Sequence, residues 1–192
     1  MSSRDEILAS IRANRPKADR SLPFVPSFEQ PEPSTPLATF KQSLERMGRM
    51  FLDPPVAGDA LQAVRDKIVK AKVVCSAVPE LVDNRDLADV HSPLELADVD
   101  IAIVRASFAV AETGSVLLSE RDLQTNALAY LPQHIIVLLD PADIVVNLHH
   151  AYRRPELHSG HYASFNTGPF ATAYIKGVLI HGAQGVGPCR SR

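Results

Sequence analysis

Two apolar runs separated by a short polar insert constrain the fold of this chain more than any other feature. The first run spans residues 100–110, the second spans 116–118, and Glu112-Thr113-Gly114-Ser115 lies between them. Apolar runs of this length bounded by turn residues are typical of buried strands. The sequence therefore predicts a strand that ends in a polar loop, at the edge of a parallel sheet where ligands often bind.

Glu112 is the residue of this loop that most needs a stabilising partner. A carboxylate in a dry crevice is costly unless a group donates a hydrogen bond to it or carries the opposite charge. Two explanations are open at this point. Either backbone N–H groups hold the carboxylate and brace the loop, or the carboxylate is kept for chemistry.

Helical and strand-like segments alternate along most of the chain. Apolar residues at spacings of three and four predict a helix from Ser34 to the Asp53-Pro54-Pro55 break, with these core residues: Leu37, Phe40, Leu44, Met47 and Phe51. Further helical segments are expected at about 59–71, 140–152 and 171–175. Strands are expected near 73–75, 100–110, 116–118, 135–139 and 178–180. This alternation predicts an α/β fold with a mostly parallel sheet covered by helices.

An N-terminal extension precedes the predicted domain. Ser2 or Ser3 can cap a short helix with one apolar face, formed by Ile7, Leu8 and Ile11. From Pro16 to Pro36 the chain has six prolines, which favour an extended linker. We expect residues 1–33 to form this helix and linker, and residues 34–192 to form one α/β domain. The helix could pack on its own domain or on a partner.

Charge and cysteine content exclude several function classes. A net charge of -2 provides no broad basic surface, so nucleic acid is not an expected partner. No apolar run is long enough to span a membrane and no signal-peptide core is present, so we expect a cytoplasmic protein. Cys75 and Cys189 form no CxxC pair and cannot hold a four-thiolate cluster. Any iron–sulfur centre would therefore belong to another protein.

A second polar loop resembles the first in composition and contains Asn166, Thr167, Gly168 and Thr172. In a parallel α/β sheet both loops can line one crevice. Backbone N–H groups freed by the glycines, together with the neutral hydroxyl and amide donors, suit a small anion such as a phosphate or carboxylate. Glycine with serine and threonine is also ordinary turn chemistry, so a purely structural role stays open.

The seven histidines do not predict a metal site. His149 and His150 are adjacent on an expected helix and cannot both face one point, while His158 and His161 fall in an expected loop. No cysteine or carboxylate lies at a familiar ligand spacing from them or from His181. We expect these histidines to be solvated or structural.

Four motifs, in the right order, resemble the signatures of the lactate utilization protein C family, or LUD domain. They are Ala111-Glu112-Thr113-Gly114-Ser115, Leu131-Pro132-Gln133-His134-Ile135 with Asp143-Ile144-Val145, Thr167-Gly168-Pro169-x-Ala171-Thr172-Ala173-x-Ile175, and Val178-Leu179-Ile180-His181-Gly182-Ala183-x-Gly185. The resemblance implies a NagB/RpiA/CoA-transferase-like α/β fold and a part in oxidising L-lactate to pyruvate. It also implies separate iron–sulfur and oxidase-like subunits, with no cofactor in this chain.

The chain departs from the family pattern in the third motif. The family usually has Ser-Gly-Pro-Ser-x-Thr-Ala-Asp-Ile-Glu, where this chain has Phe170, Tyr174 and Lys176 in place of a hydroxyl and two carboxylates. Glu112, Gly168 and Thr172 are kept. The replacements make the loop more basic, which favours an anionic ligand.

The candidate site follows from the loops and the resemblance together. CoA transferases and isomerases of the implied fold place a glutamate near a glycine, so Glu112 is the candidate catalytic residue, as nucleophile or general base. The candidate ligand-binding residues are Thr113, Gly114, Ser115, Asn166, Thr167, Gly168 and Thr172. Two other functions stay open beside the lactate-oxidising subunit. They are a stand-alone CoA-transferase/isomerase-like enzyme using Glu112, and a non-catalytic ligand-binding or assembly module.

Overall fold

The computed structural model describes residues 3–15, 23, 24, 26, 35–167, 171–173 and 179–181. The chain divides into two compact units, Met1–Gln30 and Pro31–Arg192. In the first unit, helix α1 (Ser3–Ala13) has Asp5 and Glu6 in its first turn and Arg12 in its last. These charges complement the helix dipole. The predicted N-terminal helix is therefore confirmed.

The second unit contains short helices and strands in an alternating order. Its described α-helices are α2 (Pro36–Arg46), α3 (Gln62–Ile68), α4 (Glu120–Leu123) and α5 (Leu148–Ala151). The described strands are β1 (Val74–Ser76), β2 (Ile101–Arg105), β3 (Phe108–Val110), β4 (Ser115–Ser119), β5 (His134–Leu138), β6 (Ile144–Val145), β7 (Ala163–Asn166), β8 (Ala171–Ala173) and β9 (Leu179–His181). Short 3-10 turns at 87–89, 93–96, 126–129, 141–143 and 155–158 connect them.

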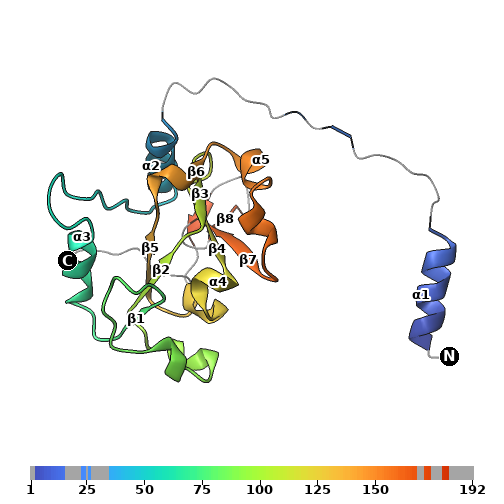
Figure 1. The fold of residues 1–192 in the computed structure, drawn as a ribbon, viewed down its shortest axis with the longest axis horizontal. Coiled ribbons are helices and arrows are strands. Elements are labelled where there is room, and N and C mark those ends of the chain that lie inside the picture. Colours follow the sequence, from blue (N-terminus) through green and yellow to red (C-terminus); the bar gives the residue numbers. More distant parts are fainter. Residues whose placement is uncertain are drawn as a thin grey trace. The chain divides into compact units, whose positions relative to one another are not determined.

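The first sheet is parallel and is covered on both faces. Its strand order is β1-β2-β5, with both neighbouring pairs parallel. Side chains alternate along β2: Ile101 and Ile103 pack with α3, while Ala102 and Val104 pack in the cluster that contains Leu123 of α4. This alternation is the period of two that a strand imposes. The predicted α/β class, with a parallel sheet covered by helices, is confirmed (Figure 1).

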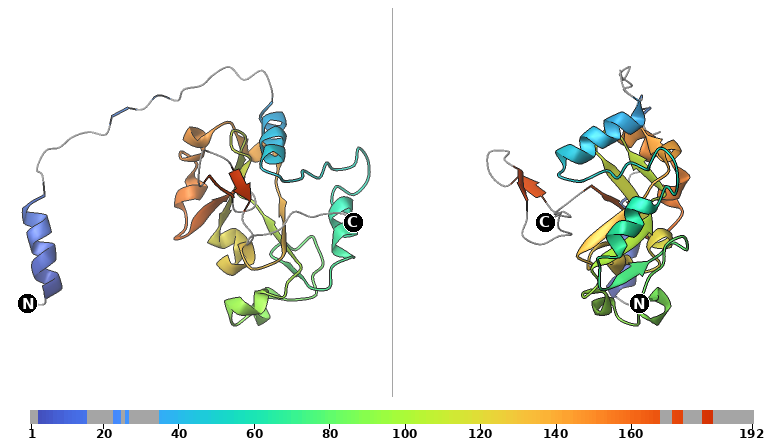
Figure 2. Two further views of the ribbon diagram at one scale, coloured as in Figure 1. Left: turned by 180° about the vertical axis from the view of Figure 1, so that it is seen from behind. Right: turned by 90° about the vertical axis from the view of Figure 1, so that its left-hand side faces the viewer.

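The second sheet is mixed and has the order β6-β3-β4-β7. β3 is parallel to β6 but antiparallel to β4, and β4 is antiparallel to β7. Ala109 packs with Phe40 of α2 on one face, while Phe108 and Val110 pack with Ala151 of α5 on the other. α2 and α3 lie on the same side of the strands and are joined by the loop 47–61 (Figures 1 and 2).

The apolar run 100–110, expected as one strand, is two strands in different sheets. The chain leaves the first sheet after Arg105, which is exposed and ion-paired with Glu80, and enters the second at Phe108. Between them, the Ser107 hydroxyl donates to the Asp122 carboxylate over 2.8 Å. Hydrophobic periodicity reports burial but does not report which sheet buries a segment, so the break was not visible in the sequence.

Helix α2 begins near its expected start but ends earlier than predicted. Thr35 caps it, because its hydroxyl accepts the N–H of Ala38. The helix ends at Arg46 because Gly48 adopts φ +74, and Arg49 N then donates to Leu44 O over 3.0 Å. This is a Schellman-type C-terminus, in which glycine takes the left-handed conformation. The predicted continuation to the Asp53 break is wrong.

Two other helical predictions are wrong for a shared reason. Val145, expected on a helix, lies in β6, and α5 begins only at Leu148. The segment 171–175, expected as a helical turn, begins with strand β8, which pairs with β9. The expected helix at about 59–71 is also shorter, as α3 shows. In β6 and β8, pairing with another strand provides the hydrogen bonds that the backbone N–H and C=O groups need. Local propensity cannot anticipate such a partner.

Candidate functional site

The polar insert forms the turn of a β-hairpin. Val110 of β3 pairs with Ser115 of β4, so residues 111–114 make the turn between antiparallel strands. The carboxyl ends of β3 and its parallel neighbour β6 do meet here. The N–H of Ala111 donates to Val145 O over 2.8 Å, and the N–H of Glu112 donates to Val146 O over 3.0 Å. The insert is therefore at the expected edge, but it is not a loop between parallel strands.

Gly114 is required for close packing, and its N–H is already bonded. That N–H donates to Val110 O over 3.0 Å, so the expected free donor for an anion is not provided by Gly114 in this structure. The residue has φ +67, and a Cβ built on it would lie 2.8 Å from Leu44 N and 2.9 Å from Ser43 C. Only glycine permits both this conformation and this approach of the turn to α2.

Glu112 is exposed, contrary to the dry crevice in which we expected it. Its Oε2 accepts the backbone N–H of Leu148 at 3.3 Å, and its own carbonyl accepts the hydroxyl of Ser43 at 3.1 Å. These contacts tie the turn to α5 and α2. They match the bracing role considered for this carboxylate, and its catalytic role stays a prediction.

Three hydroxyls join the two predicted loops. Ser115, which is only 4% exposed, lies with its Oγ 2.7 Å from Thr113 Oγ1 and 2.6 Å from Thr167 Oγ1. Antiparallel pairing of β4 with β7 places these segments side by side, with Val116 opposite Asn166. Three hydroxyls that share two hydrogen bonds use two of their three protons. One O–H of this hydroxyl cluster is therefore left to donate to another group.

A row of polar side chains extends from Asn166 along one face of β7, and sequence reasoning did not identify it as part of the site. Asn166 Nδ2 donates to Ser164 Oγ over 2.9 Å, and that oxygen also lies 2.9 Å from the hydroxyl of Tyr130. The Tyr130 and Tyr162 hydroxyls are hydrogen-bonded to each other. The only signal in the sequence was the alternation of polar residues at 162, 164 and 166, which becomes informative once a strand is assumed there.

A cleft of about 1110 Å³ lies beside these groups. Three predicted site residues line it, namely Gly114, Asn166 and Thr167. Its other walls are mostly apolar and include Val116, Leu118, Ile135 and Val137. The structure thus brings both predicted segments to one hollow, although Glu112, Thr113 and Ser115 are not among the residues that line it. Large apolar clefts with a few convergent polar groups are the usual form of ligand sites.

Two of the remaining predicted site residues, Gly168 and Thr172, come from the C-terminal part of the chain. Gly168 lies outside the described residues, as do Phe170, Tyr174 and Lys176. Thr172 belongs to strand β8, which pairs with β9, and Thr172 is opposite Ile180 in that pair. Their roles in binding stay predictions.

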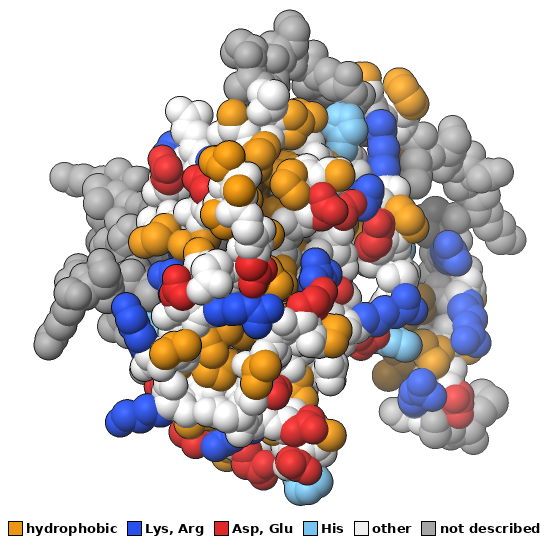
Figure 3. All heavy atoms as spheres, turned by 60° about the vertical axis from the view of Figure 1, so that its left-hand side comes forward, with side chains coloured by type: hydrophobic (Ala, Val, Ile, Leu, Met, Phe, Trp, Pro, Cys, Tyr) orange, Lys and Arg blue, Asp and Glu red, His pale blue; other side chains and the backbone are white. Residues whose placement is uncertain are grey.

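Charged residues of both signs lie on the face shown in Figure 3. Acidic and basic side chains are interspersed there with apolar ones, so this face has no continuous basic field for nucleic acid. Among the described residues, no three histidine, cysteine or acidic side chains are grouped so that they could hold a metal ion. No helix in that same part of the chain has the length and apolar character needed to cross a membrane.

Cys75 is not suited to nucleophilic chemistry. The thiol is fully buried in the core beside β2. Burial raises the pKa of the Cys75 thiol to about 11. The thiolate that would act as a nucleophile is therefore scarce at neutral pH.

The LUD domain family model matches residues 80–189, which is more than half of the chain. The chain is also similar to a DUF162 family protein from Deinococcus radiodurans whose crystal structure was determined at 1.70 Å. The two share 19% sequence identity with a TM-score of 0.59, over 69% of this chain and 87% of that chain. A likeness at this identity shows the fold alone. No curated protein matches the chain. The family model confirms the resemblance found in the sequence motifs, and the chain therefore belongs to the LUD domain family, which is associated generally with lactate utilization.

Proposed function

We propose that this chain is a cytoplasmic subunit of a complex that oxidises L-lactate to pyruvate, and that it binds a small anionic ligand at the cleft. Family membership supports the link to lactate. Oxidation of lactate to pyruvate removes two electrons, which a partner must accept. The sequence of this chain contains only Cys75 and Cys189, too few for a four-thiolate cluster, so iron–sulfur and oxidase-like subunits take that role in the proposal.

One observation carries the ligand-binding part of the proposal. The Ser115 hydroxyl links the two loops through Thr113 and Thr167, and the Thr167 end of this cluster lines the cleft. The cluster has an O–H left to donate, and Asn166 beside it adds a neutral amide. Neutral donors at the edge of an apolar cleft suit the oxygens of a small carboxylate.

The stand-alone CoA-transferase-like alternative has less support. A nucleophilic glutamate needs a position from which its carboxylate can reach the substrate. Glu112 is not among the residues that line the cleft, and its carboxylate bonds to the N–H of Leu148. No observation specifically favours the third possibility, a module that only binds a ligand or assembles partners.

The complex is tested by deletion and by co-purification. In a host without a second lactate oxidase, deleting this protein should abolish growth on L-lactate while growth on pyruvate continues, because pyruvate enters below the missing step. A tagged full-length chain should also capture proteins that contain iron and acid-labile sulfide. Normal growth on L-lactate after the deletion, or capture of no iron-containing protein, would contradict the proposal.

A further inference from the structure

The hydroxyl of Tyr130 joins the polar row of β7 to the wall of the cleft. It lies 2.9 Å from Ser164 Oγ and is also hydrogen-bonded to the hydroxyl of Tyr162. Asn166 Nδ2 donates to the same Ser164 oxygen over 2.9 Å. Tyr130 and Asn166 both line the cleft, and Tyr130 is 49% exposed. One hydroxyl oxygen, that of Ser164, therefore connects two polar residues of the cleft wall.

The hydroxyls of Tyr162, Tyr130 and Ser164 have one proton more than the hydrogen bonds between them need. Two hydrogen bonds join the three groups and use two of their three protons. Because Ser164 Oγ already accepts the amide of Asn166, its own O–H is available to donate to Tyr130. When Tyr162 donates to Tyr130 as well, the Tyr130 O–H is left for a ligand. Accepting two hydrogen bonds polarises this O–H and makes it a stronger donor.

The Tyr130 hydroxyl is a donor and not a base at neutral pH. Burial raises the pKa of Tyr130 above its ordinary value of about 10. The phenol therefore keeps its proton at neutral pH, and a ligand pairs with that proton through an acceptor oxygen. A carbonyl oxygen, which has two lone pairs and no proton of its own, meets this requirement.

Apolar side chains accompany the polar row on the same face of the sheet. Antiparallel pairing of β4 with β7 places Val116 opposite Asn166 and Leu118 opposite Ser164, and residues paired in this way share a face. Val116 and Leu118 line the cleft, as do all residues of β5. The volume of about 1110 Å³ is on the scale of a site for a drug-sized ligand, so a three-carbon acid would fill only part of it.

We propose that Tyr130 donates a hydrogen bond to the carbonyl oxygen of a neutral, mostly apolar ligand that lies in the cleft along β4 and β5. The apolar walls favour a neutral group, because burying a charge costs more than burying a carbonyl that is hydrogen-bonded. The inference goes beyond the proposed function, since it assigns a second class of ligand to the cleft and does not require the small anion to bind.

The test compares two probes of the same size. One is dimethylnaphthoquinone, whose methyl groups occupy both reactive ring positions and so prevent addition of thiols. The other is dimethylnaphthalene, which has the same rings and methyl groups but no carbonyl. Equilibrium dialysis of the full-length protein measures both affinities. Tyr130→Phe should weaken binding of the quinone by about fivefold, the effect of one neutral hydrogen bond, and leave binding of the hydrocarbon unchanged.

Tyr152→Phe is the matched control. It removes the same hydroxyl group, but Tyr152 is not among the residues that line the cleft, and its ring centroid lies 6.3 Å from that of Phe165. Its affinity for both probes should equal that of the wild type. The same loss of quinone affinity in Tyr152→Phe and Tyr130→Phe would overturn the proposal.

Three other results would also overturn it. They are wild-type quinone affinity in Tyr130→Phe, equal losses for the quinone and the hydrocarbon, and a wild type that binds neither probe. Equal losses would mean that the substitution changes the shape of the cleft and that no hydrogen bond to the carbonyl is lost.

The infrared spectrum of the quinone bound to the wild type decides the matter if Tyr130→Phe does not fold. A hydrogen bond lowers the stretching frequency of a carbonyl, so the proposal expects a lower frequency than in an apolar solvent. An unshifted frequency would contradict it. The proposed function is judged separately, by growth on L-lactate and by co-purification, so either can fail while the other stands.

Discussion

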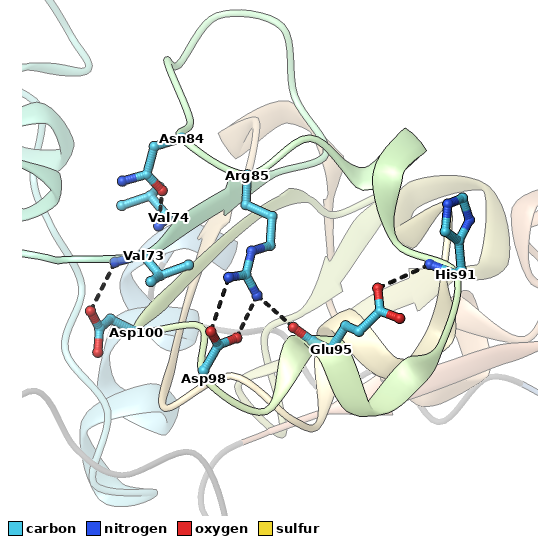
Figure 4. Close-up of polar contacts among 8 residues, drawn as sticks. All are labelled: Val73, Val74, Asn84, Arg85, His91, Glu95, Asp98 and Asp100. Atoms are coloured by element: carbon cyan, nitrogen blue, oxygen red, sulfur yellow. Dashed lines mark hydrogen bonds and ion pairs between the residues drawn. The ribbon is translucent and has the colours of Figure 1, made fainter.

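The two carboxylates that border the apolar run, Asp100 at its beginning and Glu112 after its end, stabilise the fold to different extents. Asp100 Oδ2 accepts the backbone N–H of Lys72 at 2.7 Å and that of Val73 at 3.0 Å, the second of which is drawn in Figure 4. These bonds tie the start of β2 to the segment before β1. Glu112 accepts one backbone N–H, from Leu148 at 3.3 Å. The carboxylate with the more conspicuous sequence motif is therefore the less strongly bonded one.

The difference shows that each end of the run is held by a different kind of group. At the Asp100 end, charged and amide side chains hold the backbone. Asn84 Oδ1 accepts the N–H of Val74, and Arg85, which is ion-paired with Asp98, donates to the carbonyl of Glu95 (Figure 4). At the Glu112 end, a glycine and three hydroxyls fix the turn instead. The contacts of the conspicuous polar motif join it to its neighbours in the protein, and the cleft lies beside it.

Gly114→Ala should lower the free energy of unfolding the most, because it disturbs the backbone of the turn at the Glu112 end of the run. The new methyl would meet Leu44 N at 2.8 Å at a residue with φ +67. We expect a loss of about 3 kcal/mol or more, from left-handed strain together with overpacking. Urea unfolding followed by circular dichroism measures it.

Gly58→Ala is the control for that experiment. Gly58 has φ +106 but nothing lies within 4 Å of the position its Cβ would take. Backbone strain alone should cost about 1 kcal/mol. Equal losses at the two glycines would show that α2 does not press on the turn.

Asp100→Ala should have the next largest effect, about 1–2 kcal/mol, because the N–H groups of Lys72 and Val73 lose their acceptor. Hydrogen bonds from Val73 and Lys72, in that order, hold the pKa of Asp100 below its ordinary value. A lowered pKa in the folded state means stability that is present above the unfolded value, about 4, and is lost as the pH falls through the folded value.

The difference in unfolding free energy between wild type and Asp100→Ala should therefore be constant from pH 6 to 8, about the neutral range, and shrink below about pH 4. Denaturant titrations at several pH values measure this. If the difference in unfolding free energy does not change with pH, the charge of Asp100 does not contribute to stability.

Ser115→Ala should cost about 1 kcal/mol, since it removes the central hydroxyl between Thr113 and Thr167. It should also weaken binding of a carboxylate at the cleft, because Thr167 loses the partner that orients it. Thermal melting and titration with L-lactate measure the two effects. Ser159→Ala, at an exposed residue outside the cleft, should leave both unchanged.

Glu112→Gln should have the smallest effect on stability, less than about 0.5 kcal/mol, because glutamine keeps an oxygen that can accept the Leu148 N–H. The same variant tests the alternative enzyme. If the purified chain transfers CoA and Glu112 is its nucleophile, the rate with CoA thioesters should fall by several orders of magnitude. Equal rates in the wild type and in Glu112→Gln would show that Glu112 is not the nucleophile.

Much of the fold was predictable from local patterns. The helix before residue 15, the apolar stripe of α2 and the strands near 74, 101 and 135 follow from periodicity that the structure retains. The family was also accessible, because its motifs are contiguous. The end of α2 is set locally, by the left-handed Gly48. The break between β2 and β3 and the strands at 144 and 171 were not predictable. Each depends on a partner distant in sequence, as Ile144 does on Ala109.

For the candidate site, too, some features could be predicted from the sequence and others depend on the tertiary structure. The sequence by itself determined which residues carry polar groups at Glu112–Ser115 and Asn166–Thr167, since glycine and hydroxyl residues between apolar runs are a local signal. Only the tertiary structure decided that Ser115 and Thr167 touch, that Gly114 is reserved for packing, and that Tyr130 borders the cleft. The physical reason is that strand pairing and close packing join segments more than 50 residues apart, as they join Ser115 and Thr167, and no local pattern encodes such a contact.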